Sequence, residues 1–195
     1  METFQPIFRT SLSMPDASST TGDLRVSDLT GIRVTLIQGG AANVLQTLLE
    51  SIPAGPGDLV EVGDGFLGRL TPMQFYLFGK STGAQLPTAA ELEDSFVKAK
   101  LFAHTIDQTH GTAALKLAGA EASEALSKIC GLDFHDTVFP TMQVKQTSAA
   151  KIKTLIARCD EAGVPTYHLH VSRPLGQYFL ETLWDAGQEF GIGAG

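Results

Sequence analysis

Apolar and polar positions alternate along much of the chain, and in other stretches apolar residues recur every three or four positions. The alternating stretches predict β-strands, and the three-to-four spacing predicts amphipathic helices. The predicted strands are residues 32–37, 59–62, 66–70, 75–78, 113–117, 142–146, 151–157 and 167–171. The predicted helices are residues 44–52, 88–103, 121–130 and 172–187, with Thr88 and Ser172 as N-caps and Gly131 and Gly187 as ends.

The order of these elements repeats with an offset of about 80 residues. Residues 26–103 and 107–192 each read as a strand, a glycine break, a helix, further strands and a closing helix. An internal duplication of an α+β unit explains this order, and chance similarity is the alternative. We therefore expect residues 25–195 to form one α+β domain made of two repeats.

Residues 1–24 differ in composition from the rest and predict a flexible N-terminal arm. The middle of this arm is rich in Ser, Thr, Asp and Gly, which cannot bury enough apolar area to offset the loss of chain entropy. Phe4, Ile7 and Phe8 near its start would dock on this domain or on a neighbour if the arm is not simply disordered.

The net charge and the hydropathy of the chain limit the classes of function that it could have. The net charge of −7 and pI of about 5.1 argue against nucleic acid or an anionic membrane surface as partner. No apolar run approaches the roughly 18 residues of a membrane span. The N-terminus lacks the pattern of a signal peptide, so we expect a cytoplasmic protein. A mean hydropathy of +0.08 suggests that some apolar surface is meant for a partner.

Two patterns invite a binding site. Residues 38–43 join a strand to a helix through Gly39 and Gly40, but they match neither a dinucleotide fingerprint nor a phosphate-binding loop, so a tight turn is favoured. His168 and His170 share one face of a predicted strand and would begin a zinc or iron site if His104, His110, His135 or a carboxylate joined them. A polar sheet face, solvated or at an interface, is the favoured alternative.

The remaining candidates indicate packing or solvation. Cys130 lies on the apolar stripe of a predicted helix and is expected to be a buried, inert thiol. The spacing of Cys130 and Cys159 fits no metal-binding motif. A reduced pair of thiols is favoured over a disulfide between them. Glu93 with Asp94, and Glu124 with Lys128, lie on predicted exposed helix faces. Phe179 and Trp184 share a face of the last helix that is either core or a partner surface. The residues alone thus assign no catalytic, cofactor-binding or metal site.

Several segments resemble the gamma subunit of heterotetrameric sarcosine oxidase. No single one is decisive, but their order and spacing together are specific, and they extend over roughly residues 26–192. The segments are residues 28–31, 68–75, 107–111, 115–122, 130–135, 139–140, 146–147 and 183–191. The departures are Gly131 where that family has proline, a long stretch at 79–100 and an insertion at 160–164.

That family is related to the folate-binding domain of the glycine-cleavage aminomethyltransferase. The resemblance implies a folate-binding-domain-like α+β fold of duplicated units with exchanged strands. The aminomethyltransferase carries a catalytic carboxylate in a Gly-Gly-x-x-Asp-Asp stretch, which looks like residues 65–69 here. Gly68 and Arg69 stand where the acids would be, and neither supplies a negative charge. The Lys-Gly-Cys-Tyr-x-Gly-Gln-Glu motif of the related Fe–S assembly branch is also absent.

The resemblance implies a non-catalytic structural subunit of a complex that oxidatively demethylates sarcosine to glycine. Its partners would be the alpha, beta and delta subunits. FAD, FMN, NAD, tetrahydrofolate and zinc would all sit on those subunits and none on this chain. Two alternatives stay open: a stand-alone folate-binding one-carbon protein, which would need a pocket between the repeats with a usable carboxylate, and a metal-binding protein using His168 and His170.

Overall fold

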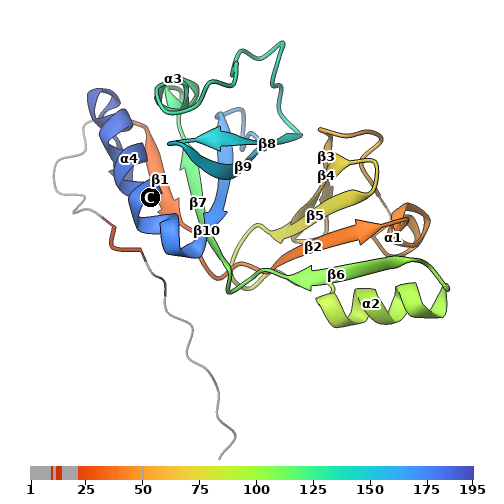
Figure 1. The fold of residues 1–195 in the computed structure, drawn as a ribbon. Helices are drawn as coiled ribbons and strands as arrows, with labels where there is room; N and C mark the ends of the chain where they lie inside the picture. Colours follow the sequence, from red (N-terminus) through yellow and green to blue (C-terminus); the bar gives the residue numbers. More distant parts are fainter. Residues whose placement is uncertain (1–9, 11, 15–21, 50) are drawn as a thin grey trace, which may run out of the picture.

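The chain folds into two facing β-sheets with helices on their outer sides (Figure 1). The computed structural model describes residues 10, 12–14, 22–49 and 51–195. One apolar cluster fills the space between the sheets, and one lies under the helices of each sheet. The layers are therefore helix, sheet, sheet, helix, and each sheet packs one face on helices and the other face on the opposite sheet.

The first sheet has five strands and comes mainly from the first half of the chain. In spatial order these are β3 (Leu59–Val62), β4 (Gly65–Thr71), β5 (Gln74–Gly79), β2 (Val34–Gly39) and β6 (Ala103–Asp107). All of its pairings are antiparallel. Helices α1 (Ala42–Leu49) and α2 (Ala89–Lys98) cover its outer face.

The second sheet has six strands and comes mainly from the second half. In spatial order these are β8 (Gln143–Ala149), β9 (Ile152–Arg158), β10 (Thr166–Ser172), β7 (Thr112–Ala118), β1 (Arg25–Asp28) and β11 (Gly193–Ala194). Helices α3 (Ala122–Ser127) and α4 (Gly176–Gly187) cover its outer face.

Apart from β11, the two sheets have the same strand order, and the two repeats exchange the strands β1 and β6. β1 opens the first repeat but pairs with β7 of the second, and β6 leads into the second repeat but pairs with β2 of the first. The remaining strands correspond in order: β3 to β8, β4 to β9, β5 to β10 and β2 to β7. The structure thus has the duplicated architecture with exchanged strands that the family resemblance implies.

The predicted strands are found within one or two residues of their expected bounds, except that β8 extends three residues further, to Ala149, and three short strands were missed. β1, β6 and β11 have two to five residues, and β6 is largely exposed, so their sequences carry little alternation. Two of the three are the strands whose partners lie in the other repeat. Local pattern does not reveal such pairing.

Several predicted helix ends were wrong. α2 begins at its capping box between Thr88 and Glu91, as expected, but it ends at Lys98 and not near residue 103. α3 ends at Ser127, so Gly131 is not its terminator; the backbone of Cys130 instead bridges to Ala149. A 3-10 turn, η1 (Arg173–Leu175), precedes α4, so Ser172 does not cap that helix. The predicted end of α4 at Gly187 is confirmed.

Contacts on the last helices also correct two expectations. Lys128 forms an ion pair with Glu189 and donates to the Ala186 carbonyl at 2.8 Å, so it does not pair with Glu124. Phe179 is fully buried, and Trp184 is half-buried against the same core cluster. This face of α4 therefore belongs to the core of the domain.

Part of the predicted arm lies on the domain. Leu12 and Leu24 are buried in the core cluster beneath α3 and α4, and Met14 packs against it. The Ser13 amide donates to Gln177 Oε1 at 2.8 Å. Phe4, Ile7 and Phe8 lie outside the described residues. Among the described residues, no helix is both long and apolar enough to cross a bilayer.

Lys100 gives a direct test of backbone strain at the end of α2. Its φ of 53° is left-handed, a conformation that costs a side-chain-bearing residue about 1 kcal/mol relative to glycine. Lys100→Gly should therefore raise the free energy of unfolding by about 1 kcal/mol in chemical denaturation. Lys100→Ala removes the charge but keeps the strain and is the matched control; equal stability of the two variants would contradict the prediction.

Candidate functional site

Two histidines and three aromatic rings fill the centre of the space between the sheets. We call this group the histidine seam: His168 and His170 of β10, Phe66 of β4, and Tyr76 and Phe78 of β5. The Phe78 ring centroid lies 5.6 Å from that of His168 and 4.8 Å from that of His170. Phe66 and Tyr76 each meet one imidazole nearly edge-on, at 5.7 and 5.5 Å. These distances are typical of packed aromatic rings.

The imidazoles share one face, as predicted, but that face is neither solvated nor open to a partner. Both residues are almost fully buried, and none of their ring nitrogens has a hydrogen-bond partner in the described part of the chain. Burial, together with Lys116 and Lys80, lowers the pKa of His168 to about 4. Burial and the neighbouring His168 lower the pKa of His170 to about 3. Both rings are therefore neutral at physiological pH.

The other histidines that were considered as metal ligands lie elsewhere. His104 contacts Gln38 on the exposed side of β2 and β6, with its Nε2 3.1 Å from Oε1. His135 contacts Thr137 in the loop before β8. No group of three His, Cys, Asp or Glu side chains converges anywhere in the part of the chain that the structure describes. The geometry therefore gives the histidine seam no set of ligands for zinc or iron.

A cleft of about 330 Å³ opens at one end of the histidine seam, between the two repeats. This volume is at the lower end of the range of small-molecule sites. Its lining is Leu36, Gln74, Tyr76, Asp107, Gln108, Gly111, Thr112, Gln146, Lys153, Leu155, His170, Val171 and Ser172. The inner wall is thus aromatic and aliphatic, and the rim carries amides, one carboxylate and one amine.

The ionisable groups of the cleft are poorly placed for acid–base catalysis. Asp107 is exposed, and its Oδ1 accepts from the Thr109 amide at 2.9 Å. Burial raises the pKa of the Tyr76 hydroxyl, with a weaker opposing effect from its hydrogen bond with Thr112. His170 stays neutral and Lys153 is exposed. The arrangement suits binding by shape and hydrogen bonding better than proton transfer.

The position where the family resemblance would place a catalytic acid is closed. Gly68 is buried in β4, and a Cβ atom there would lie 2.7 Å from Val144 Cγ1 of the second sheet. Arg69 turns away from the cleft: its guanidinium lies 5.2 Å from the Phe75 ring centre and donates to the carbonyls of Ala54 and Pro72. An aspartate at residue 68 would therefore require Val144 of the opposite sheet to shift.

The other sequence candidates have structural roles. Gly39 has a φ of 108°, so the tight turn expected at residues 38–43 is confirmed. Cys130 and Cys159 are buried free thiols, and burial raises the pKa of Cys159 to about 12. Glu93 is not simply solvated as expected: its carboxylate accepts from the Thr105 amide at 2.7 Å and so occupies the free edge of β6.

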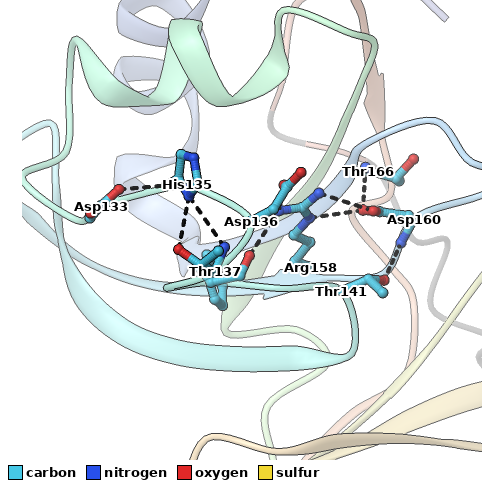
Figure 2. A network of polar contacts seen from close by, with 9 residues as sticks. Asp133, His135, Asp136, Thr137, Thr141, Arg158, Asp160 and Thr166 are labelled. Carbon is cyan, nitrogen blue, oxygen red and sulfur yellow. Dashed lines mark hydrogen bonds and ion pairs between the residues drawn. The ribbon is translucent and has the colours of Figure 1, made fainter.

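A buried arginine network is a feature that sequence reasoning missed. Arg158 of β9 is 5% exposed and makes a two-pronged contact with Asp160, at 3.0 Å for both pairs. It also donates to Asp136 at 2.6 Å (Figure 2). A further hydrogen bond goes to the Phe139 carbonyl at 2.8 Å. Asp160 in turn accepts from the amide of Thr166. The network holds the loop before β8 against β9 and β10. The sequence signal that could have predicted it was an arginine inside an apolar strand with an aspartate two positions later.

Comparisons with known proteins agree on the fold. Residues 58–195 match the family described as GCVT N-terminal domain. A chain of the heterotetrameric sarcosine oxidase from Corynebacterium sp. U-96, in complex with pyrrole 2-carboxylate, superposes with a TM-score of 0.74 and 20% identity over 90% of both chains. The glycine cleavage system aminomethyltransferase T from Bartonella henselae superposes with a TM-score of 0.65 and 17% identity. That match covers 90% of this chain and 48% of the transferase, so the chain spans about half of its length.

The histidine seam predicts how stability depends on pH. Because folding lowers both imidazole pKa values below the unfolded value of about 6.5, the unfolded chain binds protons first as the pH falls. Stability should be unaffected above pH 6.5. It should fall by about 1.4 kcal/mol per pH unit for each histidine as the pH drops toward 4. Denaturant titrations at a series of pH values measure this slope.

Histidine variants test whether this dependence of stability on pH comes from the histidine seam. His168→Leu and His170→Leu should each remove about half of it, whereas His135→Gln, at the surface, should leave it unchanged. An acid slope that persists in the His168→Leu, His170→Leu double variant would contradict the assignment.

Proposed function

The chain belongs to the GCVT N-terminal domain family, and we propose that within this family it is a non-catalytic structural subunit of a sarcosine oxidase complex. The complex as a whole would oxidatively demethylate sarcosine to glycine in the cytoplasm. This chain would correspond to the gamma subunit and would contact the alpha, beta and delta subunits, fixing their relative positions.

The closure around Gly68 is the observation that carries this proposal. A family member that acts on an amine needs a carboxylate beside it, and here Val144 fills the space that such a side chain would need. The extent of the match also supports a subunit role. The chain and the sarcosine oxidase chain cover 90% of one another, whereas the chain aligns with only 48% of the aminomethyltransferase.

The cofactors implied for such a complex do not fit this chain. A dinucleotide-binding fold for FAD or NAD would need a Gly-x-Gly-x-x-Gly fingerprint between a strand and a helix, and residues 38–43 lack it. Among the residues that the structure describes, none gives the seam a third ligand for zinc. The cleft offers tetrahydrofolate one exposed carboxylate that an adjacent backbone amide already holds. We therefore propose that all five groups bind to the partner subunits, and we derive no reaction step in this chain.

Co-expression tests the subunit role. The chain should co-purify at fixed stoichiometry with the other subunits of a sarcosine oxidase. The isolated chain should have no oxidase or aminomethyltransferase activity and no bound flavin. Omitting it should leave partner subunits that aggregate or elute as smaller species in size-exclusion chromatography. A chain that stays monomeric with every candidate subunit present contradicts the proposal.

A stand-alone folate-binding one-carbon protein is the second candidate, and the cleft is the observation that favours it. The His170 ring nitrogens lack partners in the described structure, and Asp107 and Lys153 stand at the rim. Calorimetric titration of the isolated chain with tetrahydrofolate separates the two functions. Micromolar binding that Lys153→Glu abolishes would favour this second function, and no binding favours the first.

Restoring an acid at residue 68 tests the closure directly. Gly68→Asp should lower the free energy of unfolding by about 3 kcal/mol or more, because it buries an unpaired carboxyl against Val144. It should give no aminomethyltransferase activity. Gly83→Asp is the matched control, since a Cβ there meets nothing within 4 Å. An active and stable Gly68→Asp variant would show that the site is open.

A further inference from the structure

The most exposed large apolar side chain in the described part of the chain stands at one end of the first sheet. Phe102, between α2 and β6, is 94% exposed. Val97 at the end of α2 is 70% exposed and Met73 in the β4–β5 turn is 56% exposed. The backbones of Met73 and Phe102 are joined through the turn after β2: their carbonyls accept from the amides of Gly39 and Gly40. We call Met73, Val97 and Phe102 the Phe102 cap.

The backbone that carries Phe102 is held on both sides. The Leu101 amide donates to the Phe96 carbonyl and the Lys100 amide to the Val97 carbonyl, both at 3.0 Å, which is the Schellman pattern of a helix end. Immediately after Phe102, Ala103 begins β6 and pairs with Gly39. A Cβ atom at residue 39 would lie 2.4 Å from the Phe102 carbonyl oxygen, so only glycine permits this approach.

Holding the backbone around Phe102 in this conformation costs folding free energy. Lys100 occupies the left-handed C′ position where helices usually have glycine. A large apolar ring is thus presented to solvent on a fixed and strained backbone. Strained backbone is concentrated at functional positions, and a fixed aromatic ring loses little entropy when a partner covers it. Figure 1 shows the α2–β6 connection and α1 at this same end of the sheet, away from the second sheet.

The charges around the cap are opposite in sign to the charge of the whole chain. Lys98 and Lys100 are exposed on either side of the α2 end, and His104 follows on β6. The nearest exposed carboxylates in the sequence are Asp94, one helical turn before Lys98, and Asp107, at the far end of β6; Glu93 already binds Thr105. The chain as a whole carries a net charge of −7. The cap is therefore an apolar anchor with a basic border.

We propose that the Phe102 cap docks into an apolar socket with an acidic rim on a larger subunit of the complex; this rests on the proposed function. The basic charges of Lys98 and Lys100 favour an acidic partner surface over the alternatives. Two copies of the chain meeting cap to cap would bring Lys98 and Lys100 together with the same residues of the other copy, which is repulsive. An anionic membrane would attract the two lysines but repel the remainder of an acidic chain.

Affinity measurements on the assembled complex test the docking. Phe102→Ala should weaken binding of the chain to its partner subunits by about 30-fold or more, as expected of a central aromatic anchor. Lys98→Glu with Lys100→Glu should slow association by about tenfold or more at low salt, with a smaller effect at high salt. Phe102→Leu should restore part of the affinity. Leu175→Ala, an exposed apolar residue beside the second sheet, is the matched control and should bind like the wild type.

The outcomes separate this proposal from the one on which it rests. The thermal melt of the isolated Phe102→Ala variant should equal that of the wild type, because the ring is exposed. A wild type that assembles, with Phe102→Ala binding within about threefold of it, overturns the docking site alone. A wild type that assembles with no oxidase subunit contradicts the subunit role and the docking site with it. Self-association or binding to phosphatidylserine vesicles that Phe102→Glu abolishes would assign the cap to those partners.

Discussion

The exchange of β1 and β6 between the two repeats is the constraint on which the rest of the molecule depends. Each of these short strands leaves its own repeat to pair with a central strand of the other, so neither sheet is complete without both halves of the chain. The exchange forces the two sheets to face one another. The centre of the space between them is then filled by side chains from β4, β5 and β10, and these pack as the neutral histidine seam.

That packing decides which functions the interior can support. The Gly68 position is covered by Val144 of the opposite sheet, the imidazoles are buried and neutral, and the remaining cleft has its carboxylate at the exposed rim. The interior therefore stabilises the domain and offers little for proton transfer. At the outer end of the first sheet, by contrast, Phe102 is exposed on a fixed backbone with a basic border. The packed interior and the exposed Phe102 together suggest that the chain acts by binding other subunits.

Most of the fold could be predicted from the sequence, because eight of the strands are apolar or alternating stretches of four to seven residues, and several, such as β5 and β10, are buried on both faces. The duplication was also visible, in the repeated order of strand, glycine break and helix. β1, β6 and β11 were not, because all three are short and because β1 and β6 pair with strands of the other repeat. The shared face of His168 and His170 followed from their spacing, but its burial did not, since burial depends on Phe66, Tyr76 and Phe78 about 90 residues away. The Arg158 network and the exposed Phe102 likewise depend on contacts that no local pattern records.

Turnover per flavin in an assembled complex tests the central claim, that this chain acts through its surface and not through its cleft. Complexes would be prepared with the wild-type chain and with a cleft-blocked chain carrying Gln146→Trp and Lys153→Glu, both exposed cleft residues. Sarcosine-dependent oxygen consumption would be normalised to flavin content. The account predicts the same turnover for both complexes. Normal assembly of the blocked chain with turnover reduced by about tenfold or more would place chemistry in the cleft and contradict it.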